Sequence, residues 1–259
     1  MRWGHYEYTP VSEKRAAAKM NLERLRKKDP DISPITIEGR KIVTTWWGKA
    51  WTENLESYAD YANRIGRGRS YVRNGMVLDL KISPGVIGAQ VSGSRRNPYV
   101  VRIDIDKLPE SRWNSIVEQI GRRISNAAEL VEGKFPEDLK EIFLRQGSGL
   151  FPSPKEIHME CSCPDWAYMC KHIAAVLYGT GTRLDQDPLL FFTLRGIDCS
   201  DLLKKSIDDK MNSMLKNAGK KTARVMDGAD IEELFGLKTE QAQGEQAPRP
   251  PRGRAKKQK

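Results

Sequence analysis

The chain has 259 residues, with 44 lysines and arginines against 34 aspartates and glutamates, and a formal net charge of +10. That length allows one large or two modest domains with buried cores. No stretch approaches the roughly 20 consecutive apolar residues of a membrane span, and no apolar signal-peptide core follows Met1, so we expect a soluble, cytoplasmic protein without a membrane partner. The excess of positive charge favours an anionic partner, most commonly nucleic acid.

The amino-terminal part of the chain predicts two helices separated by extended structure. The first is a basic helix over residues 16–28, and the isoleucines of residues 35–42 indicate an extended segment. A second helix begins near Trp46, because apolar residues recur one helical turn apart as far as Ile65. The glycines at positions 66 and 68 are expected to end it.

Three runs with strand character follow, and the first and third show clear alternation of apolar residues. They predict a three-stranded antiparallel meander over residues 71–82, 86–91 and 99–105, with a turn at Pro84-Gly85. Helices are expected after the meander and after the turn-rich connector 147–154. Their predicted ranges are 111–127, 136–146, 173–178 (ended by Gly179 and Gly181), 189–195, 200–218 and 231–237.

Three of the four cysteines and one of the three histidines lie within twelve residues, in the order Cys161-x-Cys163-x6-Cys170-x-His172. Thiolate and imidazole are the ligands that suit Zn²⁺, and four protein ligands leave no open position for water or substrate. A buried thiol cluster and a redox CxC pair are the alternatives, but a redox pair needs neither Cys170 nor His172. The spacing therefore predicts a structural zinc site. His158 is expected to be a strand residue beside this site, and Cys199 an ordinary thiol.

The sequence CSCPDWAYMCKHIAAVLY at 161–178 resembles a SWIM zinc finger, which is defined by the pattern CxC…CxH. DPLLFFTLRG downstream, and WWGKAWTENLE, RGRSYVRNG and GSRRNPY upstream, are similar to prokaryotic proteins of this family. The likeness covers roughly residues 44–203. It implies a module that binds DNA or proteins, often in association with helicases of the remodelling type, and it implies no reaction.

The predicted fold class is α+β, with a small antiparallel sheet and packed helices, a compact zinc-stabilised module and a helical carboxyl-terminal part. Beyond residue 238 almost no apolar residue occurs, so we expect that segment to be disordered. The predicted organisation is an α+β domain over 1–146, the SWIM module with its following helix over 147–203, a helical segment over 204–238 and a basic tail over 239–259.

Positive charge is concentrated in the tail and in residues 64–73, which hold four arginines and no acid. We interpret 64–73 either as a loop whose guanidinium groups and amides contact phosphates or as a solvated loop. Arg95 and Arg96, in a loop between strands, could extend the same surface, and Lys171 adds charge beside the zinc ligands. The candidate nucleic-acid-binding residues are Arg64, Arg67, Arg69, Arg73, Arg95, Arg96 and Lys171.

Two function classes compete, and an enzyme is disfavoured. The first is a non-catalytic zinc protein that binds nucleic acid, with DNA favoured over RNA; the second is an adaptor for a remodelling-type helicase, with residues 229–237 as one possible docking peptide. Asp104 and Asp106 form a DxD pair on a predicted strand, which we interpret as the solvent face of that strand. Trp51 is expected in the core, and Trp46 and Trp47 are either core residues or a stacking platform. The oligomeric state stays open.

Overall fold

The computed structural model describes residues 9–123, 137–145, 147–198 and 211, and its centre is an antiparallel sheet. All described residues except Met211 belong to one unit within residues 1–210. The predicted boundary at residue 147 falls inside this unit. Several predictions fall on residues that the structure does not describe, Met211 excepted. They are Cys199, the helices over 200–218 and 231–237, the segment 229–237 and the tail.

Four strands form the sheet in the order β1-β2-β3-β4, each antiparallel to its neighbour. The predicted meander is confirmed, although its first strand starts six residues later than expected. Gly85 has a φ of +73° in the predicted turn between β1 and β2, a conformation that favours glycine. The fourth strand comes from the cysteine-rich segment. The strands are β1 (Val77–Ser83), β2 (Val86–Val91), β3 (Tyr99–Ile105) and β4 (Ile157–Cys161).

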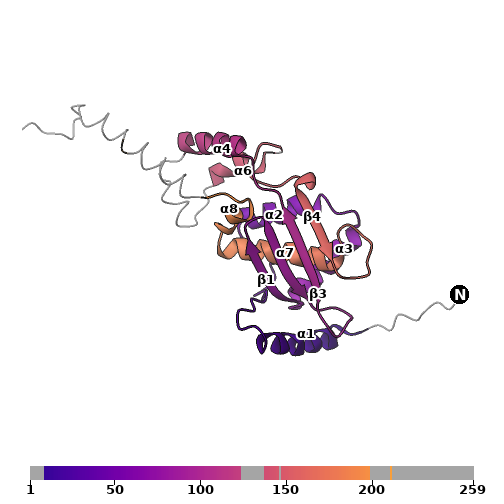
Figure 1. The fold of residues 1–259 in the computed structure, drawn as a ribbon. Helices are drawn as coiled ribbons and strands as arrows, with labels where there is room; N and C mark the ends of the chain where they lie inside the picture. Colours follow the sequence, from indigo (N-terminus) through magenta and orange to yellow (C-terminus); the bar gives the residue numbers. More distant parts are fainter. Residues whose placement is uncertain (1–8, 124–136, 146, 199–210, 212–259) are drawn as a thin grey trace, which may run out of the picture. The chain divides into compact units, whose positions relative to one another are not determined.

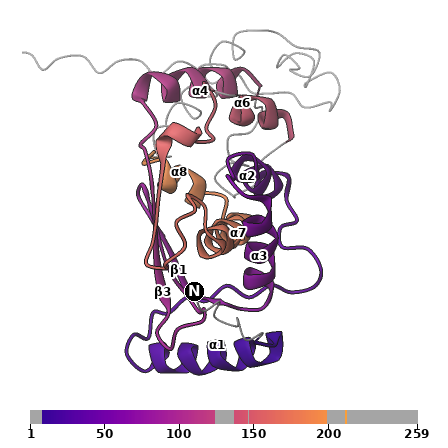
Figure 2. The same cartoon turned by 90° about the vertical axis from the view of Figure 1, so that its right-hand side faces the viewer.

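One face of the sheet packs against helices. Every second residue of β3 from Tyr99 to Ile105 is buried, whereas Val100 and Arg102 between them are exposed. Helix α7 (Lys171–Gln186) lies on the buried face, and α2 (Trp46–Glu56) and α3 (Ala62–Arg73) pack on the far side of α7 (Figures 1 and 2). This part of the fold thus has three layers, with α7 in the middle.

Helix α7 is far longer than the predicted helix 173–178. It continues through both glycines that were expected to end it. At these two positions other side chains pack closely against the helix. A Cβ at Gly179 would lie 3.0 Å from the Ile35 side chain, and one at Gly181 would lie 3.0 Å from Val43. Eleven of its sixteen residues are buried, so its sequence lacks the broad polar face by which an exposed helix is recognised.

The predicted helix 46–65 is two helices. Thr45 caps α2 by accepting a hydrogen bond from the Gly48 N–H (3.1 Å), and α2 ends at Glu56. Helix α3 then begins at Ala62 and runs through Gly66 and Gly68 to Arg73. Both the predicted helix end and the predicted strand start at residue 71 are therefore wrong.

The remaining elements lie at the ends of the sheet. Helix α1 is at one end, and α4 and α6 are at the other (Figures 1 and 2). The segment 33–35 runs beside β1, where the Leu80 N–H donates to the Ser33 carbonyl and the Ile35 N–H donates to the Val77 carbonyl. None of the helices in the described ranges is long and apolar enough to cross a membrane. These elements are α1 (Val11–Arg26), α4 (Glu110–Arg123), η1 (Glu137–Leu139), α6 (Lys140–Leu144), η2 (Pro154–Glu156) and α8 (Leu190–Leu194).

Candidate metal centre

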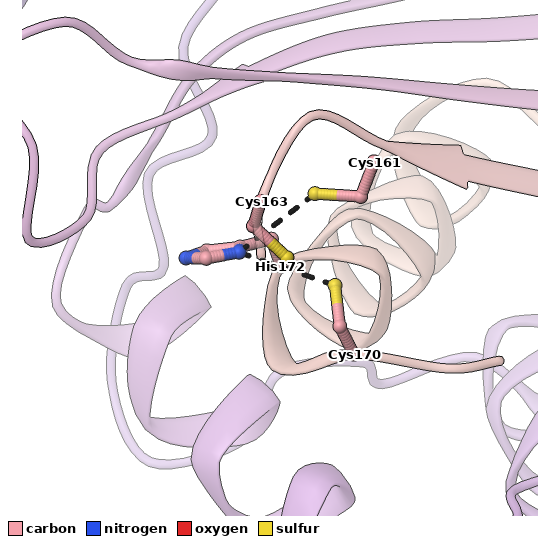
Figure 3. A group of neighbouring side chains, drawn as sticks. All are labelled: Cys161, Cys163, Cys170 and His172. Atoms are coloured by element: carbon pink, nitrogen blue, oxygen red, sulfur yellow. Dashed lines mark hydrogen bonds between the residues drawn. The ribbon is translucent and has the colours of Figure 1, made fainter. Parts of the chain in front are cut away.

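The four predicted metal ligands lie together at the junction of the sheet and the central helix. Cys161 ends β4, Cys163 lies in the turn that follows, Cys170 is the N-cap residue of α7, and His172 is in its first turn. The three thiols and the imidazole point toward one another (Figure 3). Their ligand atoms all lie within 4.8 Å of one another. Within the described ranges this is the one group of three or more cysteine, histidine or acidic side chains that could hold a metal ion.

The distances suit a tetrahedral ion. The Nδ1 atom of His172 is 3.8 Å from the Cys161 sulfur and 3.9 Å from the Cys170 sulfur. With metal–sulfur bonds of about 2.3 Å and metal–nitrogen bonds of about 2.0 Å, a tetrahedron separates sulfur from nitrogen by about 3.5 Å. These two sulfur–nitrogen distances are within a few tenths of an ångström of that value. The four side-chain donors fill all four positions of a tetrahedral ion, so the site is closed: it has no open coordination position.

The thiols constrain one another's ionisation. A hydrogen bond between Cys161 and Cys170 raises the pKa of Cys161 and lowers that of Cys170. Burial raises the pKa of Cys163. Three thiolates at this spacing repel one another, whereas a divalent cation between them removes that cost. The donor set therefore fits a metal better than it fits three free thiols.

His172 is held by aromatic rings. Its side chain is buried, with the Tyr99 ring stacked on it at 4.4 Å between centroids and the Tyr71 ring edge-on at 5.5 Å. Its Nε2 atom is buried, faces Gly93 and has no hydrogen-bond partner among the described residues. Metal-binding histidines usually donate this second N–H to a polar group. The two aromatic rings fix the orientation of the imidazole.

Sequence reasoning missed Tyr99 and Gly93 as neighbours of the site. They lie more than 70 positions before His172, and no spacing rule connects a strand residue with a helix residue that far along the chain. The GSRRNPY segment contains both, but neither its likeness to the SWIM family nor its prediction as a basic loop before a strand placed it beside the cysteines. The pairing of β3 with β4 carries Tyr99 to the cysteines.

The other candidate metal-binding residues stay apart from this cluster. His158 is an exposed residue of β4, and its Nε2 lies 3.6 Å from the Asp106 carboxylate. Asp104 is paired with Arg102, its neighbour on the solvent face of β3. No DxD metal group forms within the described residues.

The tryptophans pack inside the fold. Trp51 is fully buried and donates from Nε1 to the Leu177 carbonyl at 2.9 Å. Trp46 and Trp47 are partly buried, and Trp47 donates from Nε1 to the Leu184 carbonyl at 2.9 Å. The Trp46 ring lies 6.4 Å from the Phe143 ring of α6, and these contacts favour the core interpretation over the stacking platform.

The arginine-rich segment 64–73 is helical, so its prediction as a loop is wrong. Arg64 forms an ion pair with Asp165 in the loop between the cysteine pairs, at 3.1 Å. Arg69 pairs with Glu56 at 2.6 Å and donates to the Tyr178 hydroxyl. Arg73 donates to the Arg40 carbonyl at 3.2 Å. The four arginines therefore do not form a single phosphate cradle, because two of them hold the helices and the cysteine-rich loop together.

A different group of cations lies beside the ligands. The Lys171 ammonium is 5.8 Å from the centre of the Tyr71 ring, and the Arg95 guanidinium is 5.4 Å from the centre of the Tyr99 ring. Arg67 is exposed on α3. Burial raises the pKa of Tyr71, and the positive charge of Arg67 acts in the opposite direction on that pKa. We call Arg67, Arg95 and Lys171 the cationic rim. Arg96 is exposed in the same loop as Arg95, and its carbonyl accepts a hydrogen bond from Arg24.

Comparison with known proteins agrees with the geometry. Residues 157–178, which hold all four ligands, match the SWIM zinc finger family. The chain is also similar to "Uncharacterized protein Rv2102" of Mycobacterium tuberculosis (strain ATCC 25618 / H37Rv), with 39% identity over 163 residues. That alignment covers 62% of this chain and 58% of the relative, so the chain spans less than two thirds of the relative's length. No solved structure matches the chain. The chain therefore carries a SWIM zinc finger, built from β4, the turn after it and the first half of α7.

Proposed function

We propose that the protein is a non-catalytic zinc protein that binds nucleic acid, and DNA in particular, through the face around its finger. Three thiolates and one imidazole are a donor set that suits Zn²⁺. Because the set is closed, the ion stabilises the junction of β4 and α7 and has no position at which a substrate could bind. Its role is structural, because it fixes the arrangement of the face around the finger.

The observation that carries the proposal is the position of Lys171 and Arg95 over the two rings that enclose His172. The three rim cations come from α3, the β2–β3 loop and the start of α7, so only the tertiary fold brings them together. Each cation–ring contact orients a flexible side chain without neutralising it. Metal binding and the arrangement of charge are thereby linked through His172.

The rim cations differ from Arg64 and Arg69 in being free of carboxylates. Arg64 and Arg69 are in ion pairs, whereas Arg67, Arg95 and Lys171 have no ion-pair partner in the described part of the chain. Cations that are free of carboxylates are available for phosphate contacts, which dominate the affinity of most nucleic-acid-binding proteins.

Binding to labelled DNA and RNA over a range of salt concentrations tests the proposal. We expect log affinity to fall linearly with log salt, and we expect Lys171→Ala and Arg67→Ala each to reduce that slope by about 1. Arg102→Ala is the matched control, because it removes one positive charge from the opposite face of the sheet, where Asp104 already neutralises it. Failure to bind either nucleic acid at low salt would overturn the proposal and favour an adaptor for a remodelling-type helicase.

A further inference from the structure

An exposed aromatic pair lies where the finger meets the start of α3. Trp166, between Cys163 and Cys170, has 81% of its surface exposed, and Tyr61 before α3 has 42% exposed. Their rings meet edge to face, with centroids 5.7 Å apart and planes at 86°. Tryptophan is usually largely buried, so a side chain this exposed is notable unless a ligand covers it.

The loop that carries Trp166 is tied down on both sides of it. Asp165 binds the Arg64 guanidinium through both carboxylate oxygens, at 3.1 Å each. Asp60 accepts hydrogen bonds from the backbone N–H groups of Tyr168 (2.9 Å) and Met169 (3.3 Å). The neighbouring Ala167 and Met169 side chains are buried. Trp166 is therefore held outward by its surroundings, and a ligand that stacks on it pays little entropy to order the loop.

The pair is continuous with the cationic rim. Tyr61, Arg64, Arg67 and Tyr71 recur at three- and four-residue spacing, so they follow one side of α3. At 1.5 Å per residue this line is about 15 Å long. It begins beside Trp166 and ends at Tyr71, over which Lys171 lies. The two acids near Trp166 are already engaged, Asp165 by Arg64 and Asp60 by two backbone amides, which limits their repulsion of a phosphate.

We propose that Trp166 stacks on an unpaired base, with the Tyr61 ring supporting Trp166 edge to face, while Arg67 and Lys171 contact the adjoining phosphates, so that the protein prefers single-stranded nucleic acid to duplex. This inference rests on the proposed function and specifies its ligand. Exposed aromatic rings beside cations are the usual platform for single strands, because every base offers a flat face. Base pairs in a duplex are stacked on their own neighbours and leave no such face open. Duplex binding by the rim alone would use only the phosphates.

The test measures the affinity of the full chain, loaded with zinc, for one DNA sequence as a single strand and as a duplex. We expect Trp166→Ala to weaken single-strand binding roughly 5- to 150-fold, the range found when a stacking aromatic is removed, and to leave duplex binding within about twofold. Trp166→Phe keeps a flat ring and is expected to retain most of the affinity. The salt slope should be unchanged in both variants, because stacking releases no counterions.

The outcomes separate this inference from the function on which it rests. Equal loss of duplex and single-strand binding in Trp166→Ala, with zinc content unchanged, would overturn the stacking role while leaving nucleic-acid binding intact. So would undiminished single-strand binding, which would leave the aromatic pair to a protein partner. Absence of binding to either form by the unaltered protein at low salt would instead refute the proposed function itself.

Discussion

Gly68 of α3 lies directly against Ala174 of α7. A Cβ at position 68 would come within 2.5 Å of the Ala174 Cβ and 3.0 Å of the α7 backbone. The two helices therefore approach more closely at this point than a larger residue would permit. The close approach also sets Tyr71, three residues further along α3, against the His172 ring.

Replacing that glycine should separate the helices. We expect Gly68→Ala to lower the free energy of unfolding by about 1–3 kcal/mol, because the added methyl group overpacks a rigid contact. Gly66→Ala is the matched control in the same helix: its Cβ would have no atom within 4 Å, so higher helix propensity should make it neutral or stabilising. Urea unfolding of the two variants measures the difference, and equal stabilities would contradict the packing role of Gly68.

Removing the metal should loosen the finger and its neighbours. We expect one zinc ion per chain by elemental analysis, and a chelator or Cys163→Ser should remove the ion and lower the unfolding midpoint, because metal affinity is coupled to folding. Cys199→Ser, which changes the cysteine outside the motif, should keep the full zinc content. Retention of zinc in Cys163→Ser would show that the ligand set is different.

The contact of Gly93 with the imidazole predicts an effect on metal affinity. A Cβ at Gly93 would lie 2.4 Å from the Tyr99 ring and 3.0 Å from the Nε2 atom of His172. Gly93→Ala should displace the stacked ring and weaken zinc binding by about 10- to 100-fold, as other changes beside metal ligands do. Competition with a coloured chelator measures this. Gly88→Ala, whose Cβ would touch nothing within 4 Å, should bind zinc normally.

A buried ion pair predicts how stability depends on pH. Arg195 is fully buried and donates to the Glu156 carboxylate at 2.8 Å. Burial raises the pKa of Glu156, but hydrogen bonds from Arg195 and Ser153 outweigh it and lower the pKa to about 2. A carboxyl group with a depressed folded-state pKa stabilises the protein above its unfolded value of 4.5, and this contribution is lost as the pH falls from there to about 2.

Glu156→Gln tests this pair. It should cost about 3–5 kcal/mol at neutral pH, because it leaves the Arg195 charge buried without its partner. The cost should shrink between pH 5 and pH 3, where the unaltered protein begins to lose the same contribution. Urea unfolding at several pH values measures both quantities. A cost that does not vary with pH would assign the effect to packing rather than to charge.

Local patterns in the sequence predicted the features that depend on neighbouring residues. The spacing of Cys161, Cys163, Cys170 and His172 indicates a metal site because the six residues between the two pairs can form a loop that closes around an ion wherever it lies in the fold. Alternation indicated β1 and β3 because one side of a half-buried strand must be apolar. Both signals arise within a dozen residues of chain.

Only the tertiary structure decided the features that depend on close packing between distant segments. Gly68, Gly179 and Gly181 predict helix ends when the chain is considered alone, whereas in the fold they allow other residues to approach a continuing helix. From the sequence, the arginines of α3 suited a loop that contacts phosphates. In the fold, Asp165 and Glu56 form ion pairs with two of them. Tyr99 and His172 are more than 70 positions apart, and the pairing of β3 with β4 brings them together. Burial against a partner overrides local preference, and the partners are known only once the chain has folded.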